Sequence, residues 1–322
     1  MRIGILGAGN IARKMALTVN GMNEATAYAI ASRSLEKAEK FASDFKMDKA
    51  YGSYEALLTD PKVDLVYIAT PHSHHYEHIK LALNHNKPVL CEKSFTVNAT
   101  QAEEVINLAR EKKLLLAEAI WTRYLPMRKM LDDVLSSGII GEVKSLTANL
   151  GYVIHHIPRM ADPHLAGGAL LDVGVYTINF ALMVLGDQIE KIDSSVMFTE
   201  TGVDAQNSIV FEYKGKAMAM LHSSQMASTD RRGMIFGDKG YIEVKNINNP
   251  EVIRVFDTEH KLIKEVSQPP QITGFEYQVQ ACFEAIRSKS VECPQMPHSE
   301  ILRVMGLMDT LRVQWKMKYP ME

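Results

Sequence analysis

The sequence predicts an α/β protein in which a doubly wound parallel sheet is followed by an α+β domain with a large, mostly antiparallel, open-faced sheet. Three observations predict this class: a length of 322 residues, alternating segments of strand and helix length as far as residue 121, and a succession of strands after it. A chain of this length exceeds the usual size of a single core. We therefore expect two domains, residues 1–122 and 123–322.

The first domain alternates short apolar runs with amphipathic segments. Runs of strand length occupy residues 2–8, 25–33, 63–71, 87–94 and 114–121. Segments of helix length occupy residues 10–22, 34–45, 53–60, 72–86 and 98–112. This order of strands and helices is typical of a parallel sheet with helices on both faces, which binds ligands at the carboxyl ends of its strands.

The second domain has a different rhythm. Predicted helices cover residues 125–138, 167–186, 277–289 and 299–318. Predicted strands cover residues 145–153, 191–198, 207–215, 216–225, 231–237, 240–246 and 251–257. Strands in direct succession, joined by turn signals such as Lys214-Gly215, indicate a mostly antiparallel sheet.

Composition and charge restrict the partners. Hydrophobic residues make up 46% of the chain, charged residues make up 23%, and the net charge is -2. Such a chain is expected to fold throughout and offers no basic stripe to a nucleic acid or an anionic membrane surface. No uninterrupted apolar run approaches the roughly 20 residues of a membrane span, and the N-terminus reads as a strand rather than a signal peptide. Three widely spaced cysteines are typical of free thiols in a reducing compartment, so we expect a cytoplasmic protein.

A glycine-rich loop directly follows the first predicted strand. It reads Gly7-Ala8-Gly9-Asn10-Ile11-Ala12, a G-x-G-x-x-A sequence at the start of a helix. The first glycine permits a tight turn, the second lets the backbone approach a pyrophosphate, and the alanine lets the helix pack closely on the strand. Because a βαβ unit surrounds the loop, we predict a dinucleotide-binding Rossmann domain with Gly7, Gly9, Asn10 and Ile11 at the coenzyme.

The end of the second predicted strand indicates which dinucleotide binds. It reads Ala31-Ser32-Arg33-Ser34 and has no carboxylate for the ribose hydroxyl of NAD(H). The Ser32 hydroxyl and the permanently charged Arg33 guanidinium suit a 2′-phosphate. We therefore predict that NADP(H) is preferred and that NAD(H) is the alternative coenzyme. The other interpretation is that Arg33 only begins a solvated helix.

Charged residues also follow the strand predicted at residues 87–94. Glu92 and Lys93 stand at its carboxyl end, where an open α/β sheet binds ligands. A lysine beside a bound nicotinamide can donate a hydrogen bond to a substrate hydroxyl or lower the pKa of a neighbouring base. The alternative is a solvated surface lysine.

In the second domain, a glycine-rich predicted helix carries a carboxylate and a phenol. The segment from Gly167 to Tyr176 reads GGALLDVGVY, so that Asp172 and Tyr176 are four residues apart and share one helix face. Such a pair can act as acid and base. The spacing is also consistent with an aspartate that interacts with the helix dipole and a tyrosine in the core.

Histidines are dense in two segments. Residues 72–78 include four of them, of which only His74 and His78 have i, i+4 spacing. No cysteine or carboxylate cluster completes a ligand set there, so we predict no metal. The loop predicted before the 167–186 helix contains three candidates to line the substrate cleft, namely His155, His156 and His164.

Taken together, the motifs resemble those of a known family. Gly7 to Ala12, Ala69-Thr70-Pro71, Cys91-Glu92-Lys93 and Gly167 to Tyr176 are similar to the signatures of the glucose-fructose oxidoreductase and inositol dehydrogenase family, often written Gfo/Idh/MocA. The resemblance covers nearly the whole chain. The segment 118–126, EAIWTRYLP, resembles the domain-joining motif of the branch that contains dimeric dihydrodiol dehydrogenases and NADP-dependent xylose dehydrogenases.

The resemblance implies a site to which both domains contribute. Lys93 is expected to be the catalytic lysine of a Glu-Lys-Pro motif, although Ser94 stands where the family usually has a proline whose bond to the lysine is cis in some members. Asp172 and Tyr176 are expected to complete the catalytic set. Further coenzyme contacts are implied for Thr70, Pro71, His72, Glu92, Lys93, Trp121 and Arg123. Substrate contacts are implied for Lys93, Trp121, His155, Asp172 and Tyr176. The family also commonly dimerises through the open face of the second-domain sheet.

These expectations lead to the hypothesis of hydride transfer between NADP(H) and a ring CH-OH of a pyranose sugar or a cyclic trans-diol. Tyr176 is expected to move the hydroxyl proton, Lys93 to hold the oxygen and lower the pKa of the tyrosine, and Asp172 to orient both. Two alternatives are open: a non-catalytic NADP(H)-binding sensor, and a glycosidase that uses a tightly held nicotinamide for transient oxidation. The particular substrate and the direction of the reaction do not follow from a single sequence.

Overall fold

The computed structural model describes residues 1–322, and the chain forms two compact units. The first unit consists of Met1–Tyr124 and Gln271–Gly306, and the second consists of Leu125–Pro270 and Leu307–Glu322. The sequence pattern assigned all residues after 122 to the second domain, whereas the structure assigns 271–306 to the first unit. A helical pattern shows which face of a helix is buried but not against which sheet it packs.

The first unit is built on a parallel sheet of six strands in the order β3-β2-β1-β4-β5-β6. The strands are β1 (Arg2–Leu6), β2 (Thr26–Ala31), β3 (Lys49–Tyr51), β4 (Leu65–Ile68), β5 (Val89–Glu92) and β6 (Leu116–Ala119). Every residue of β4, β5 and β6 is buried, and their sequences are apolar except for Glu92 and Glu118. The numbering falls from β3 to β1 and rises from β4 to β6, so the strand order reverses between the neighbouring strands β1 and β4. A ligand crevice is expected at the carboxyl ends of the strands around such a reversal.

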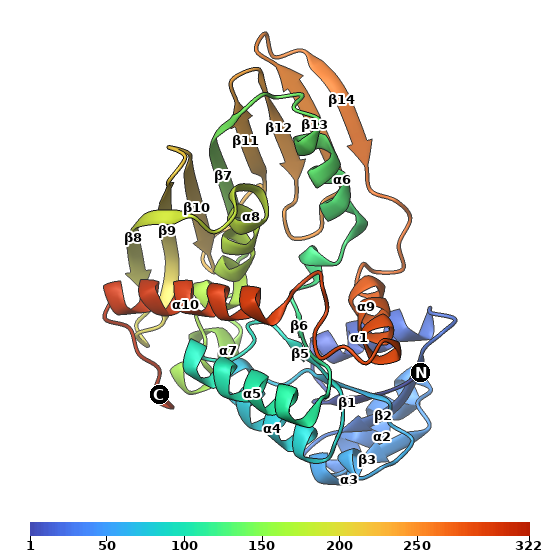
Figure 1. Ribbon diagram of the computed structural model, residues 1–322. Helices are drawn as coiled ribbons and strands as arrows, with labels where there is room; N and C mark the ends of the chain where they lie inside the picture. Colours follow the sequence, from blue (N-terminus) through green and yellow to red (C-terminus); the bar gives the residue numbers. More distant parts are fainter. The chain divides into compact units, whose positions relative to one another are not determined.

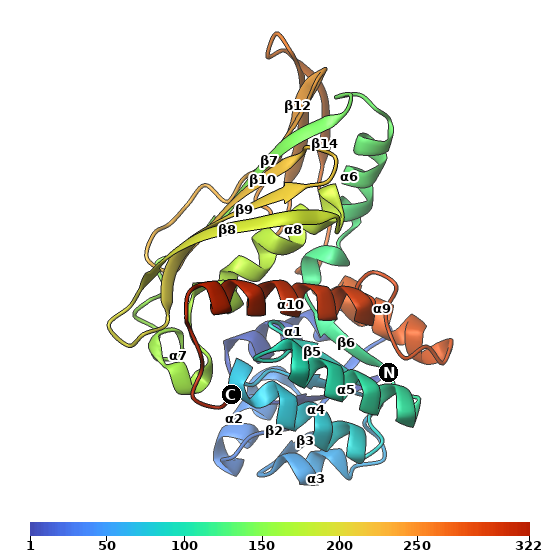
Figure 2. The same ribbon diagram turned by 60° about the vertical axis from the view of Figure 1, so that its left-hand side comes forward.

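Helices cover both faces of this sheet, as Figures 1 and 2 show. The helices of the first unit are α1 (Asn10–Asn20), α2 (Leu35–Phe45), α3 (Tyr54–Leu58), α4 (His75–Asn84), α5 (Ala99–Lys112), α9 (Glu276–Arg287) and the first part of α10 (His298–Gln314). α1 packs on α2 and α4 packs on α5, so each pair forms part of one layer. Ser34 and Asn98 cap α2 and α5 by accepting a backbone N–H three residues further on.

The second unit is built on an eight-stranded sheet in the order β14-β13-β12-β11-β7-β10-β9-β8. The strands are β7 (Val143–Gly151), β8 (Ile189–Phe198), β9 (Asp204–Tyr213), β10 (Met218–Ser224), β11 (Gly233–Gly237), β12 (Gly240–Lys245), β13 (Val252–Asp257) and β14 (Leu262–Ser267). All neighbouring strands are antiparallel except β7 and β10. The predicted fold class, parallel sheet and mostly antiparallel sheet in succession, is therefore confirmed.

One face of the second sheet is covered by a central helix. The helices of this unit are α6 (Pro126–Ser136), α7 (Pro158–Ala161), α8 (Val175–Leu185) and the end of α10. α8 packs against β7 and β10, where alternate strand residues such as Leu146, Ala148 and Leu221 are buried. The stretch Pro163–Leu185 is long and apolar enough by composition to cross a membrane, but 83% of its most apolar part is buried inside the protein, as in a core helix.

The helix predicted at residues 167–186 is not a uniform α-helix. It begins with a π-helical turn, Leu170–Gly174, which continues directly into α8. π-helical turns are rare and occur frequently at functional sites. The sequence does not predict this turn. Nearly every residue of the segment is buried, so its apolar residues do not alternate with polar ones in a way that reveals the helix type.

Candidate active site

The glycine-rich loop of the first unit has the geometry of a phosphate cradle. Gly7 has a φ of +96°, and a Cβ there would lie 3.0 Å from the Ala69 carbonyl oxygen. A Cβ on Gly9 would meet nothing nearer than that same oxygen at 4.0 Å. α1 begins at Asn10 with no side-chain cap, so its first N–H groups can serve a ligand. A dinucleotide pyrophosphate fits this loop, with Ile11 and Asn10 at the helix start.

At the end of β2, Ser32 and Arg33 precede the next helix rather than belong to it. α2 begins at Leu35 with Ser34 as its N-cap. Ser32 is nearly buried and its hydroxyl accepts the Ser34 N–H at 3.4 Å, whereas Arg33 is exposed. Burial and then the Arg33 charge lower the pKa of His74, which lies after β4. Arg33 and His74 therefore lie near each other, on opposite sides of β1 in the strand order.

At the end of β4, Thr70 is joined to two histidines. Its hydroxyl lies 2.9 Å from His78 Nδ1, and its carbonyl oxygen lies 2.8 Å from His75 Nε2. The other ring nitrogen of His75 lies 2.8 Å from the carbonyl oxygen of Ser94, so this ring connects the ends of β4 and β5. Burial lowers the pKa of His75 to about 4. Sequence reasoning considered His75 only as a metal ligand and missed this link.

Pro71 and His72 belong to the same loop after β4 and lie close to His75. Pro71 precedes a short 3-10 turn that contains His72, which is nearly buried, and the His72 and His75 rings meet edge to face at 5.7 Å. No group of three or more His, Cys, Asp or Glu side chains in the protein is arranged to hold a metal ion.

At the end of β5, the Glu92 side chain is buried. Its carboxylate accepts the hydroxyl of the buried Tyr67 on β4 and the backbone N–H of Lys93, the latter at 3.2 Å. Glu92 therefore fixes the main chain from which the Lys93 side chain extends. The peptide bond between Lys93 and the buried Ser94 is cis.

Trp121 and Arg123 are both held by the 271–306 segment. The Trp121 ring stacks on Phe275 with 4.4 Å between centroids, and Lys14 Nζ lies 5.0 Å from the Trp121 centroid. Burial lowers the pKa of Lys14. Arg123 Nη2 donates to Glu300 Oε2 at 3.0 Å. Sequence reasoning missed Lys14 and Phe275, because nothing local in either segment indicates their meeting.

The second unit carries Asp172 and Tyr176 on one continuous helix. Asp172 is 7% exposed and Tyr176 is 8% exposed. Asp172 lies in the π-helical turn and Tyr176 in the first turn of α8, four residues later, so they leave the helix on the same side. Asp172 Oδ1 accepts a hydrogen bond from Arg159 Nη1 at 3.1 Å. The exposed His155 lies in the loop before α7, where its backbone N–H donates to the Gln225 carbonyl oxygen.

A buried carboxylate supports the start of this helix. Asp204 Oδ2 accepts the Leu170 N–H at 2.7 Å and the Asn207 amide at 2.9 Å. Burial raises the pKa of Asp204 to about 7. The Tyr319 hydroxyl donates to the Gly167 carbonyl oxygen at 2.7 Å, just before the same helix. Asp204 was not predicted, since a lone aspartate at a strand start carries no sequence signal.

Comparison with known proteins agrees with both units. Residues 1–119 match the oxidoreductase family with an NAD-binding Rossmann fold, and residues 128–243 match the Gfo/Idh/MocA C-terminal domain. The chain therefore belongs to the Gfo/Idh/MocA family, and it is an NAD(P)-dependent oxidoreductase. The family resemblance predicted from the motifs is confirmed.

Particular relatives cover almost the whole chain. It is 34% identical to trans-1,2-dihydrobenzene-1,2-diol dehydrogenase of Xenopus tropicalis over 98% of both chains. It is 33% identical to the enzyme of that name from Homo sapiens over 100% of this chain and 99% of the relative. Among solved structures it is similar to KijD10, a 3-ketoreductase from Actinomadura kijaniata in complex with NADP and TDP-benzene, with 27% identity, a TM-score of 0.89 and 97% coverage of each chain.

Proposed function

We propose that the chain transfers a hydride between NADP(H) and a ring CH-OH of a pyranose sugar or a cyclic trans-diol. The observation that carries the proposal is the combination of a phosphate cradle at Gly7 and Gly9 with a buried acid and phenol, Asp172 and Tyr176, on one helix. The names of the relatives, which include dihydrodiol dehydrogenases over nearly the full length, support the substrate class.

Each catalytic side chain has a distinct part in this proposal. Tyr176 takes the proton of the substrate hydroxyl in oxidation and returns it in reduction. The Lys93 ammonium holds the same oxygen and stabilises the phenolate form of the tyrosine. Asp172 accepts hydrogen bonds and orients both groups. Bound nicotinamide supplies the acceptor or donor of the hydride. Solved structures of KijD10 include a lysine-to-alanine variant and a tyrosine-to-phenylalanine variant, the residue types of Lys93 and Tyr176.

The preference for NADP(H) is proposed from the end of β2. Ser32 and Arg33 stand before the cap of α2, and no carboxylate occupies this strand end. An exposed guanidinium can bind a phosphate through two donors at once.

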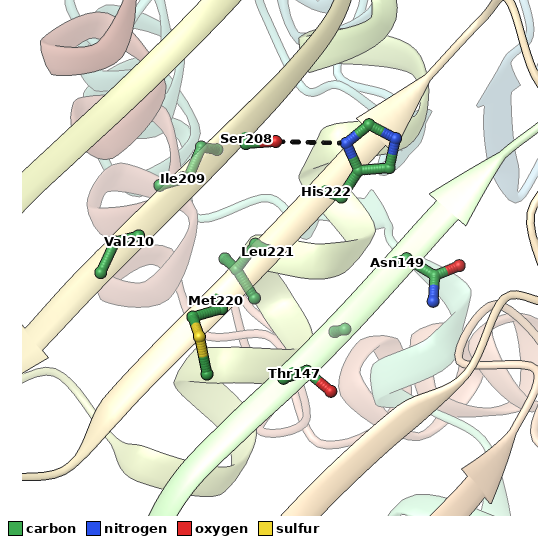
Figure 3. A pocket seen from close by; sticks show the side chains of 9 residues that line it. Thr147, Asn149, Ser208, Ile209, Val210, Met220, Leu221 and His222 are labelled. Carbon is green, nitrogen blue, oxygen red and sulfur yellow. Dashed lines mark hydrogen bonds between the residues drawn. The ribbon is translucent and has the colours of Figure 1, made fainter.

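A homodimer is proposed through the outer face of the second sheet. This face carries exposed apolar side chains on β8 and β10, including Met197 (63% exposed), Met218 (38%) and Met220 (41%). A hollow of about 270 Å³ lies on this face. Figure 3 shows Thr147, Met220 and His222, which line it, on neighbouring strands, and the hydrogen bond between Ser208 and His222. Exposed apolar side chains gathered on one sheet face favour an interaction surface.

The proposed function is tested by coenzyme reduction with the purified protein. NADP and NAD are compared across a panel of aldopyranoses, inositols and cyclic trans-diols, and absorbance of the reduced coenzyme is followed. Turnover with NADP and one of these compounds is expected. Tight NADP(H) binding without turnover would favour the sensor, and coenzyme that co-purifies without being consumed would favour the glycosidase.

A further inference from the structure

The carboxylate of Asp172 is paired with a residue outside the helix that carries it. Arg159 Nη1 lies 3.1 Å from Asp172 Oδ1. The arginine side chain is 43% exposed, whereas the aspartate side chain is only 10% exposed. The pair therefore joins a half-solvated guanidinium to a nearly buried carboxylate.

The main chain around Arg159 is fixed against the start of the Asp172 helix. A Cβ on Gly167 would lie 2.6 Å from the Arg159 carbonyl oxygen and 2.5 Å from that of Met160, so only glycine permits this approach. The Met160 side chain is fully buried, and the Gly167 N–H donates to the Asp162 carbonyl at 3.0 Å. α7 is thus packed on the helix start by backbone contacts, and Arg159 is presented to Asp172 from a fixed position.

The charge of Arg159 favours the ionised form of the Asp172 carboxylate. A nearly buried carboxylate is costly unless it is paired, and a permanently charged guanidinium nearby favours its ionised form. An ionised aspartate accepts hydrogen bonds but donates none.

We propose that Arg159 is a positioning residue for the reaction. It holds Asp172 ionised and in one orientation, so that Asp172 aligns the hydrogen-bond donors of the reacting centre and is not itself a proton donor. This inference rests on the proposed function, because that function gives Asp172 its place at the reacting centre.

The chain offers a second pair of an arginine and a nearly buried carboxylate as a control. Arg232 Nη1 lies 3.0 Å from Glu243 Oε1, with 51% of the arginine and 10% of the glutamate side chain exposed. Distance and exposure are nearly those of the Arg159 pair, but Glu243 Oε2 also lies 3.5 Å from Arg254 Nη1. Arg232 is not in the helix or loop that carries the proposed catalytic residues. Arg232→Ala therefore measures the general effect on turnover of removing a half-exposed arginine that pairs with a carboxylate.

The experiment compares kcat, KM and melting temperature for Arg159→Ala, Arg159→Lys, Arg232→Ala, Asp172→Asn and the double variant Arg159→Ala/Asp172→Asn. We expect Arg159→Ala to lower kcat about ten- to hundredfold, the range for a lost hydrogen bond to a charged group. Arg159→Lys and added guanidinium ion should restore part of the loss. The double variant should be no slower than Asp172→Asn, because Arg159 acts through Asp172.

Several outcomes would overturn the inference. Equal effects of Arg159→Ala and Arg232→Ala, or independent losses that multiply in the double variant, would show that Arg159 does not act through Asp172. If Asp172→Asn itself lowers turnover, either of these outcomes leaves the proposed function intact. Normal turnover in Asp172→Asn would instead refute the role of Asp172 in the proposed function, and the role of Arg159 with it.

Discussion

Replacing Asp204 by asparagine should remove a loss of stability that the wild type undergoes between about pH 4 and pH 7. Asp204 is fully buried, and its Oδ2 accepts the Leu170 and Asn207 donors while Oδ1 has no hydrogen-bond partner. Asparagine has the same shape and keeps one accepting oxygen, but it carries no charge into the core. The cost of burying the ionised carboxylate is removed, and the support for the Asp172 helix is kept.

The magnitude follows from the pKa of Asp204. Burial raises it from 3.8 to about 7. Because the folded-state pKa exceeds the unfolded one, the folded protein binds the proton more tightly, and stability falls as the pH rises from about 4 to about 7. A difference of roughly three pH units between the two pKa values corresponds to about 4 kcal/mol as an upper value. Asp204→Asn lacks this term, so the difference in unfolding free energy between the variant and the wild type should shift in favour of the variant across this window.

The assay is urea unfolding of both proteins at several values between pH 4 and pH 8. The difference in unfolding free energy should increase with pH up to about pH 7 and then remain level. Asp133→Asn is the control, since the Asp133 side chain is 63% exposed and pairs only with a neighbouring lysine on α6. A difference between wild type and Asp204→Asn that stays constant from pH 4 to pH 8 would refute the reasoning.

Two further predictions concern the coenzyme and the assembly. Arg33→Ser should weaken NADP(H) binding about ten- to hundredfold in a fluorescence titration, because a charge-assisted contact to the 2′-phosphate is lost, and should leave NAD(H) binding unchanged; equal losses for both coenzymes would contradict the role of Arg33. Met220→Glu places a charge on the outer face of the second sheet and should convert the proposed dimer to a monomer, as measured by light scattering at micromolar concentration. A wild-type monomer or an unaffected dimer would contradict the proposed interface.

Local sequence patterns predicted the features that depend on neighbouring residues. The tight turn at Gly7, the start of α1 at Asn10 and the alternation of strands and helices all follow from residues close together in the chain. The sequence pattern indicated five of the six strands of the first sheet and missed the three-residue strand β3. The general rules for doubly wound folds led to the carboxyl ends of β1, β2, β4 and β5, where most of the predicted coenzyme residues lie.

Features that depend on distant residues could not be read in this way. Trp121 meets Phe275, and Leu170 meets Asp204, but neither partner has a pattern that indicates the other. The 271–306 segment joins the first unit through contacts such as that of His298 with the Leu116 carbonyl, which a helical pattern does not reveal. Arg159 follows a proline in a short loop helix and resembles any solvated arginine until its aspartate partner is placed beside it.

The central claim is that Lys93 and Tyr176 perform the chemistry while the Gly7 loop holds the coenzyme. It is tested most directly by measuring turnover and NADPH affinity together in Lys93→Ala and Tyr176→Phe. The account predicts that each variant loses turnover by about a hundredfold or more, the factor typical of a lost acid or base, and binds NADPH nearly as tightly as the wild type. Loss of NADPH binding in either variant, or near-normal turnover in Tyr176→Phe, would contradict it.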